Sequence, residues 1–203
     1  MRVLVACEES QEVCKAFRAR GHTAFSCDII PCSGGHPEWH IQADAREIIK
    51  LPWDMIIAHP PCTYMSNAGA RWLYRGGHLD SERFVLGMEG RKLFFELYEA
   101  NCEKIAIENP VPSSVFKLPK PSQVIQPYEY GEPWSKKTYL WLKGLPSLIP
   151  TNIVTEHYPY ITSGSYRKSH DPKYKGASRR GGSAKSRSKT FPGIAAAMAE
   201  QWG

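Results

Sequence analysis

Apolar residues recur along the chain in short runs, and most of these runs end in an acidic residue or a proline. Such runs suit single buried strands, whereas the segments between several of them carry apolar residues at helical spacing. The pattern predicts strands over residues 2–6, 23–27, 41–43, 55–58, 104–108, 123–130 and 137–142. It predicts helices over residues 11–20, 45–50, 80–102 and 191–202. This alternation predicts an α/β fold with a mostly parallel sheet, and the last two strands are expected to be antiparallel at its edge.

Residues at the helix ends refine these predictions. Ser10 is expected to cap the first helix, and Gly21 stands where a left-handed residue commonly ends one. The apolar residues of the long helix, Val85 and Met88 among them, are expected to belong to the core. Pro192 lies near the start of the last helix, a position that proline favours.

The second strand ends in Asp28. In nucleotide-binding α/β folds an acid at this point commonly hydrogen-bonds ribose hydroxyls, although an acid at a strand end also serves solubility alone. The glycine fingerprint GxGxxG is absent, so nothing indicates a cradle for phosphates. The sequence therefore favours a cofactor without a pyrophosphate.

The segment 53–69 joins a buried strand to a rigid turn. The strand stops at His59-Pro60-Pro61, where two prolines remove backbone donors, and Cys62 follows directly. Open α/β sheets place their chemistry at the carboxyl ends of strands, so Cys62 is a candidate functional thiol. The alternative is a buried structural cysteine in a proline loop.

Four potential zinc ligands, Cys27, Cys32, His36 and His40, lie in or beside the loop at 31–40. Their spacing matches no common closed zinc pattern, so no metal is predicted. A zinc-containing interaction module built on these residues remains an alternative, and it would hold stoichiometric metal.

Length and composition suit one domain, or one domain with an appendage, of 203 residues. No apolar run approaches membrane-spanning length, and the first residues do not resemble a secretory signal. The six cysteines are spread out without a CxxC pair, which suits reduced thiols. A cytoplasmic protein is expected.

The net charge of +6 is concentrated in one segment. Residues 163–189 hold nine basic residues and one acidic residue, whereas the rest of the chain holds seventeen basic and nineteen acidic residues. Arginines and lysines spaced by glycine and serine, with interleaved tyrosines, suit contacts with a nucleic-acid backbone. The alternative is a solvated loop without a partner.

Four features now stand in one order: Asp28 after the second strand, Asp44 after the third, Pro-Pro-Cys62 after the fourth and Glu108-Asn109 after the fifth. This order resembles that of the DNA cytosine-5 methyltransferases, and the chain is similar to a short, phage-type member. The segment from Pro192 to Ala199 resembles the last motif of that family.

The resemblance implies a Rossmann-like methyltransferase fold that uses S-adenosylmethionine, with the C-terminal helix returning to the cofactor side. It implies a catalytic domain over residues 1–142 and 189–203. Residues 143–188 then form a short basic segment in place of a full target-recognition domain.

The resemblance also assigns roles to residues. Cys62 would be the nucleophile that adds to carbon-6 of cytosine, in an environment that favours its thiolate, and Glu108 would be the acid at ring nitrogen-3, with a pKa raised by a closed site. The residues implied to bind S-adenosylmethionine are Cys7, Glu8, Glu9, Ser10, Asp28, Ile29, Asp44, Ala45 and Pro60. Those expected to bind DNA, duplex DNA above all, are Lys136, Lys137, Arg167, Lys168, Arg179, Arg180, Lys185 and Arg187.

The chain departs from the family in three places. Residues 7–11 replace the glycine-rich first motif, and Lys136-Lys137 stand where the family has arginines, so the fixed fork of arginine is lost. Only about 45 residues separate Leu142 from the last motif. Weak or short sequence specificity, a protein partner or an unusual substrate is therefore expected. The alternatives are a degenerate relative that binds nucleic acid without catalysis, and the same chemistry on RNA or a pyrimidine nucleotide.

Overall fold

The computed structural model describes residues 1–158 and 188–203. Its main sheet has seven strands in the order β3-β2-β1-β4-β7-β9-β8. The strands are β1 (Arg2–Ala6), β2 (Thr23–Asp28), β3 (His40–Gln42), β4 (Met55–Ala58), β7 (Ile105–Pro110), β8 (Gln123–Ile125) and β9 (Thr138–Lys143). The first five pair in parallel, and β9 is antiparallel to both β7 and β8. The predicted α/β class and the antiparallel edge are confirmed, and the sheet is compatible with a Rossmann-like fold.

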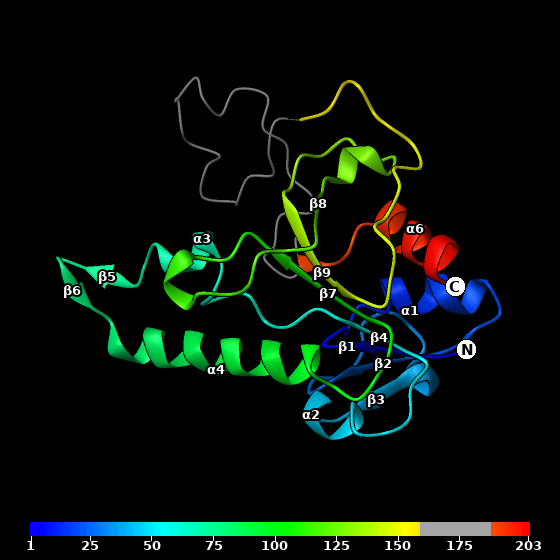
Figure 1. The fold of residues 1–203 in the computed structure, drawn as a ribbon, viewed down its shortest axis with the longest axis horizontal. Coiled ribbons are helices and arrows are strands. Elements are labelled where there is room, and N and C mark those ends of the chain that lie inside the picture. Colours follow the sequence, from blue (N-terminus) through cyan, green and yellow to red (C-terminus); the bar gives the residue numbers. More distant parts are fainter. Residues whose placement is uncertain (159–187) are drawn as a thin grey trace.

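Helices cover both faces of this sheet (Figure 1). They are α1 (Glu12–Ala19), α2 (Ala45–Ile48), α4 (Ser81–Tyr98) and α6 (Pro192–Trp202), with a short α3 (Asn67–Ala70) after the Cys62 turn. Val3 and Val5 pack on the side of α1 and α6, whereas Leu4 and Ala6 pack on the side of α2 and α4. Because side chains alternate along a strand and both faces are buried, these strands read as continuous apolar runs.

The last helix returns to the first one. Helix α6 lies beside α1 (Figure 1), and Ile194, Met198 and Trp202 join the core on that face. A Cβ at Gly193 would lie 1.8 Å from the carbonyl oxygen of Tyr130, so only glycine allows the start of α6 to lie this close to the chain before β9. Leu148 is buried against the same core, which joins residues beyond β9 to the body.

Several boundaries differ from the sequence prediction. Strand β8 ends at Ile125 because Pro127 begins a 3-10 turn over Pro127–Glu129, so the strand predicted to residue 130 is shorter. Helix α4 ends at Tyr98 rather than 102. Strand β3 is shifted by one residue, and β7 continues through Pro110, where it pairs with Thr138.

A small hairpin projects from the body where α3 leads towards α4 (Figure 1). Its strands are β5 (Tyr74–Arg75) and β6 (His78–Leu79), and all four residues are exposed. Gly76 and Gly77 form the turn with positive φ angles of 57° and 83°, which glycine adopts without strain. Leu73 anchors its base in a small cluster with Met65 and Phe116.

Among the described helices, none combines the length and apolar character that a membrane span requires.

Candidate active site

The carboxyl ends of the central parallel strands surround a cavity of about 870 Å³. It receives side chains from the turns after β1, β4 and β7, from the segment before β9 and from the segment before α6. Of the residues expected from the sequence, those that line it are Cys7, Glu8, Glu9, Ser10, Asp28, Pro60, Cys62, Glu108, Lys136 and Lys137. Ile29, Asp44 and Ala45 are not part of this lining.

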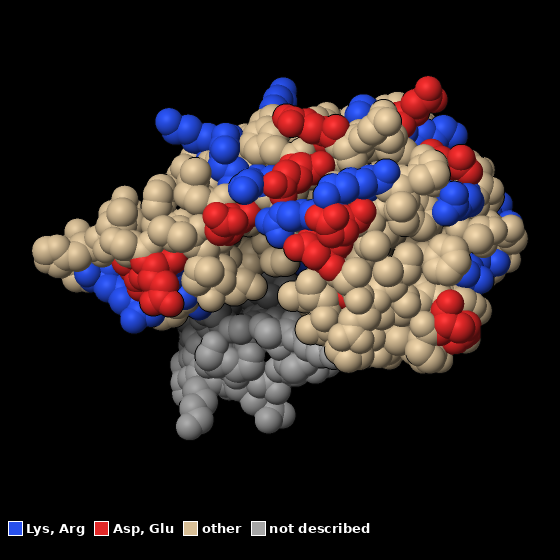
Figure 2. Space-filling view, turned by 90° about the horizontal axis from the view of Figure 1, so that it is seen from below, with Lys and Arg blue, Asp and Glu red and all other residues tan. Residues whose placement is uncertain are grey.

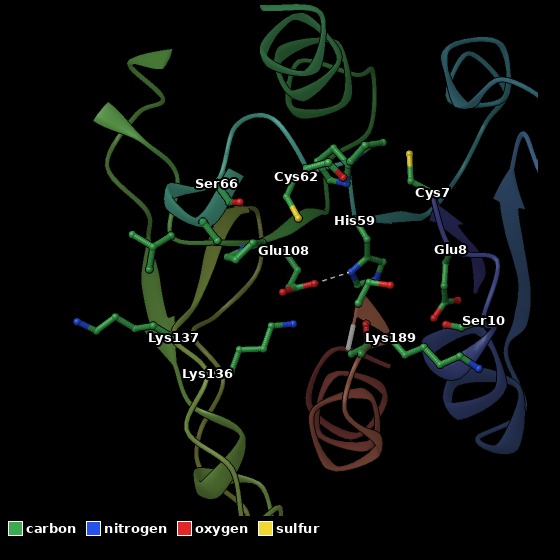
Figure 3. A pocket seen from close by; sticks show the side chains of 18 of the residues that line it. Cys7, Glu8, Ser10, His59, Cys62, Ser66, Glu108, Lys136, Lys137 and Lys189 are labelled. Atoms are coloured by element: carbon green, nitrogen blue, oxygen red, sulfur yellow. Dashed lines mark hydrogen bonds and ion pairs between the residues drawn. The ribbon is translucent and has the colours of Figure 1, made fainter. Parts of the chain in front are cut away.

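The Cys62 turn is held by backbone hydrogen bonds. The amides of Met65 and Ser66 donate to the Cys62 carbonyl oxygen at 3.2 and 2.9 Å. Asn109, buried at the end of β7, donates from Nδ2 to the Pro60 carbonyl oxygen at 3.3 Å. The turns that carry Cys62 and Glu108 are therefore tied together, and the two side chains face one cavity (Figure 3).

The environment of Cys62 does not favour a thiolate, contrary to expectation. Burial raises the pKa of the Cys62 thiol, and the negative charge of Glu108 raises it further. The Lys136 ammonium opposes both effects but does not outweigh them. A sulfur on a partly enclosed turn facing a carboxylate keeps its proton more readily than a sulfur in water.

Glu108 differs from expectation in the opposite direction. His59 Nδ1 lies 3.0 Å from Glu108 Oε2, and the two side chains are only 12% and 11% exposed. Burial acts to raise the pKa of Glu108, but the hydrogen bond from His59 and the positive charges of Lys136 and His59 outweigh it. The pKa of Glu108 therefore lies below its ordinary value, not above it.

His59 also lines this site, although the sequence pattern predicts no role for it. Its position could have indicated one, because it is the first residue after β4 and directly precedes the Pro-Pro turn. Burial lowers its pKa, but the hydrogen bond and charge of Glu108, together with the charge of Glu8, raise the pKa above its ordinary value. Both shifts favour the same charge state of the pair, an imidazolium that donates to a carboxylate.

Glu8, rather than Ser10, accepts hydrogen bonds from the amides at the start of α1. Its carboxylate accepts hydrogen bonds from the amides of Val13 and Cys14 at 2.7 and 3.2 Å, and Gln11 precedes the helix in a left-handed conformation without a side-chain cap. The prediction that Ser10 caps the helix is wrong. Because the Glu8 carboxylate already accepts from these two amides, they are not available to a phosphate.

The same turn holds bulky residues in left-handed conformations, where the resemblance noted from the sequence would imply a glycine-rich motif. Cys7 and Gln11 have φ angles of 58° and 60°, which glycine would adopt more easily. Burial raises the pKa of Glu8 to about 7, although the charge of His59 and the two amides act to lower it. Burial also raises the pKa of Cys7 to about 12.

The expected adenosine-binding residues lie around the ends of β2 and β3. Asp28 lines the cavity, and Ile29 beside it is 71% exposed. Asp44 caps α2 by accepting from the Arg46 amide at 2.9 Å, and it also lies 3.3 Å from Arg46 Nη1. Ala45, the first residue of α2, is buried. Asp28 and Asp44 both act on the pKa of Cys7, so they lie on the same side of the site.

The loop at 31–40 is held by hydrogen bonds and ring stacking. Gln11 Nε2 donates to the His36 carbonyl oxygen at 2.8 Å, and its Oε1 accepts from the His36 amide at 3.1 Å. The His36 ring stacks on Trp39 at 3.6 Å, and His40 Nδ1 lies 2.9 Å from Ser26 Oγ. Within residues 1–158 and 188–203, no three acidic, histidine or cysteine side chains group as a metal site would need.

The expected nucleic-acid contacts fall into two groups. Lys136 and Lys137 line the cavity, and Lys136 points towards Glu108 (Figure 3). The others, Arg167, Lys168, Arg179, Arg180, Lys185 and Arg187, lie outside the described residues. Figure 2 shows basic and acidic side chains interspersed on the face it displays.

Fold and site together define an α/β protein in which one cavity at the sheet ends is lined by two cysteines, a histidine–carboxylate pair and three lysines. The sequence matches no model of a known protein family, and no curated protein sequence matches it either.

Proposed function

We propose that the chain is an S-adenosylmethionine-dependent methyltransferase that methylates carbon-5 of cytosine in DNA through a transient Cys62 adduct. The observation that supports this most is that Cys62 and Glu108, from separate strand ends, line the same cavity. A nucleophile and an acid must reach the same pyrimidine ring, and this arrangement allows it. The ordered features of the sequence and the C-terminal helix packed beside α1 agree with the proposal.

Features of the cavity support S-adenosylmethionine over a nucleotide with phosphates as the proposed cofactor. The amides at the start of α1 are taken by Glu8, which leaves no phosphate site there. Asp28 faces the cavity at a strand end suited to ribose hydroxyls. Glu8 and Glu9 bring acidic groups to the half of the cavity that would face the charged methionine part. S-adenosylmethionine, when bound, supplies an electrophilic methyl group.

The chain's own residues would prepare the cytosine ring. Carbon-5 of cytosine is a poor nucleophile until a sulfur adds to carbon-6, and Cys62 is placed to make that bond. Glu108 would hydrogen-bond ring nitrogen-3, where charge develops during the addition. The target base must leave its stack to enter the cavity. Lys136 is the cation whose charge favours the Cys62 thiolate.

The decisive experiment follows a labelled methyl group. The protein is incubated with tritiated S-adenosylmethionine and, in parallel, duplex DNA, single-stranded DNA and RNA, and the modified nucleoside is identified. We expect 5-methylcytosine in DNA. Cys62→Ala should abolish transfer while cofactor binding is retained, and Cys32→Ala, a cysteine outside the cavity lining, should not. Transfer by Cys62→Ala would reject the assigned nucleophile.

One observation favours a second candidate, a relative that binds nucleic acid without catalysis. Burial and Glu108 raise the pKa of Cys62, and a protonated thiol is a poor nucleophile. DNA containing 5-fluorocytosine distinguishes the two functions, because it traps the adduct after methyl transfer. Mass spectrometry should find the base attached to Cys62. Tight DNA binding without any adduct would support the second candidate.

A further inference from the structure

His59 lies at the middle of the cavity (Figure 3). Cys62 and Glu108 are on one side of it, and Cys7, Glu8 and Ser10 are on the other. Its backbone amide donates to the Ala6 carbonyl oxygen at 2.9 Å, which fixes the residue against β1. Its ring is fixed by Nδ1, 3.0 Å from Glu108 Oε2. Among the described residues, His59 Nε2 is buried without a hydrogen-bond partner.

Three charged groups face His59 from three other parts of the chain. Glu108 approaches from β7 and Glu8 from the turn before α1, whereas Lys136 approaches from the segment before β9. Two carboxyl groups against one ammonium favour the imidazolium form, and an imidazolium must donate to Glu108 from Nδ1. Glu108 is then an ionised carboxylate held in one orientation, and the Cys62 sulfur points towards it (Figure 3).

This arrangement creates a difficulty for the expected chemistry. The thiol that must lose a proton keeps it, because burial and Glu108 raise the pKa of Cys62. The acid that must give a proton has none, because His59 and Lys136 outweigh burial and lower the pKa of Glu108. The protonated thiol and the ionised carboxylate are both compatible with the reaction if the proton that leaves the Cys62 sulfur is the one that ring nitrogen-3 receives.

We propose that Glu108 takes the proton of Cys62 and passes it to ring nitrogen-3 of cytosine, and that His59 is the positioning residue that keeps Glu108 ionised and aimed for this transfer. This inference rests on the proposed function. The S–H bond of Cys62 breaks as the S–C6 bond forms, and nitrogen-3 gains one proton as the ring becomes an enamine. Glu108 ends as it began, a carboxylate facing His59. Protons and electrons balance within the site, without a base from solvent.

The proposed proton transfer predicts a distinctive dependence of the rate of adduct formation on pH. If the thiol lost its proton to solvent, the rate of adduct formation would rise about tenfold per pH unit throughout the range below the thiol pKa. If Glu108 takes the proton, the number of protons shared by Cys62, Glu108 and the base is constant, and the rate is flat while Glu108 is ionised and His59 is charged. Glu8, whose pKa is about 7, lies on the other side of His59 and takes no part in the transfer. In His59→Asn a neutral donor replaces the imidazolium and Lys136 is left as the cation that opposes burial, so the pKa of Glu108 should be higher than in wild type.

The test measures adduct formation on 5-fluorocytosine DNA in single turnovers from about pH 6 to about pH 8. Wild type should change less than about threefold, whereas His59→Asn should be at least about tenfold slower at the acidic end than at the basic end. His22→Asn, a histidine outside the cavity lining, is the matched control and should follow wild type. A wild-type rate that rises about tenfold per pH unit would overturn the inference, as would a flat profile for His59→Asn.

A second measurement covers variants that lose activity. With 13C-labelled glutamate, the Glu108 carboxyl resonance, assigned by its absence in Glu108→Gln, should report an ionised group near pH 6 in wild type and a higher titration midpoint in His59→Asn. An unchanged midpoint would overturn the role of His59. If wild type forms neither an adduct nor methylated product on any substrate, the proposed function itself has failed. An adduct with the wrong pH profile removes only this inference.

Discussion

Two buried glutamates in one cavity behave in opposite ways, and single contacts explain the difference. Burial raises the pKa of Glu8 to about 7, because the two helix amides and the charge of His59 compensate only in part. Glu108 is also buried, but its direct hydrogen bond with His59 and the charge of Lys136 bring its pKa below the ordinary value. Of these two glutamates, Glu108 is therefore the one that stays ionised, and Glu8 titrates near neutrality.

Glu8 should make stability depend on pH. Its pKa is about 7 in the folded chain against 4.5 for an ordinary glutamate, so its contribution is fully present below about pH 4.5 and is lost as pH rises through 7. Across that window the free energy of unfolding should fall by about 2–3 kcal/mol. In Glu8→Gln this decline should disappear. Urea unfolding at several pH values measures both curves, with Glu89→Gln, at an exposed glutamate of α4, as control.

A Glu8→Gln curve that declines as steeply as wild type would contradict the burial of an ionisable group at this position.

The positions of the two catalytic candidates, Cys62 and Glu108, were predictable from the strand ends, but their charge states were not. Those depend on His59, which is far from Glu108 in sequence and meets it only because β4 and β7 are neighbours in the sheet.

At the scale of elements, the sequence predicted the regular core well and its periphery poorly. Apolar runs revealed the strands because both faces of the sheet are covered. The hairpin of β5 and β6 was not predicted, because two residues per strand carry no periodicity. The expectation that Val85 and Met88 are core is wrong. They are 57% and 38% exposed, because this half of α4 extends beyond the sheet towards the hairpin (Figure 1).

Alanine substitutions at two glycines of α4 test how tightly the outer half of this helix is packed. A Cβ at Gly87 would lie 2.3 Å from the ring of Phe116, which is only 1% exposed, whereas a Cβ at Gly90 would lie 3.2 Å from the flexible thioether of Met65. Gly87→Ala should therefore lower the free energy of unfolding by about 1–3 kcal/mol despite the better helix propensity of alanine. Gly90→Ala should be neutral or stabilise by up to about 1 kcal/mol.

Thermal or urea unfolding of the two alanine variants, compared with wild type, measures these changes. Equal stability of both variants would show that Phe116 can move aside, and that the hairpin and the start of α4 are less firmly joined to the Cys62 turn than their packing indicates.

For the whole molecule, charge is unevenly distributed along the sequence. The chain outside residues 163–189 has seventeen basic and nineteen acidic residues, and the face in Figure 2 mixes both signs. The alternation of strands and helices was enough to predict the sheet class. The sequence did not predict that residues after β9 join the α1–α6 core through Leu148, because no local pattern distinguishes that contact.

Nucleic-acid affinity should depend on salt through the basic segment. Replacing Arg179, Arg180, Lys185 and Arg187 with glutamine should reduce the slope of log affinity against log salt concentration by up to about 3–4 for duplex DNA, because each lost phosphate contact removes about 0.9. Fluorescence anisotropy at several salt concentrations measures the slope. The matched control replaces four exposed basic residues outside the cavity lining: Arg20, Lys50, Lys92 and Lys120. Equal slopes for both sets would make the segment a solvated loop.

The carboxylate at the start of α1 has a consequence for selectivity among small molecules. Sheets of this kind commonly offer those amides to ATP or to dinucleotides, which are abundant in cells. Here Glu8 already accepts from them. Such metabolites should therefore compete poorly for the cavity even at millimolar levels.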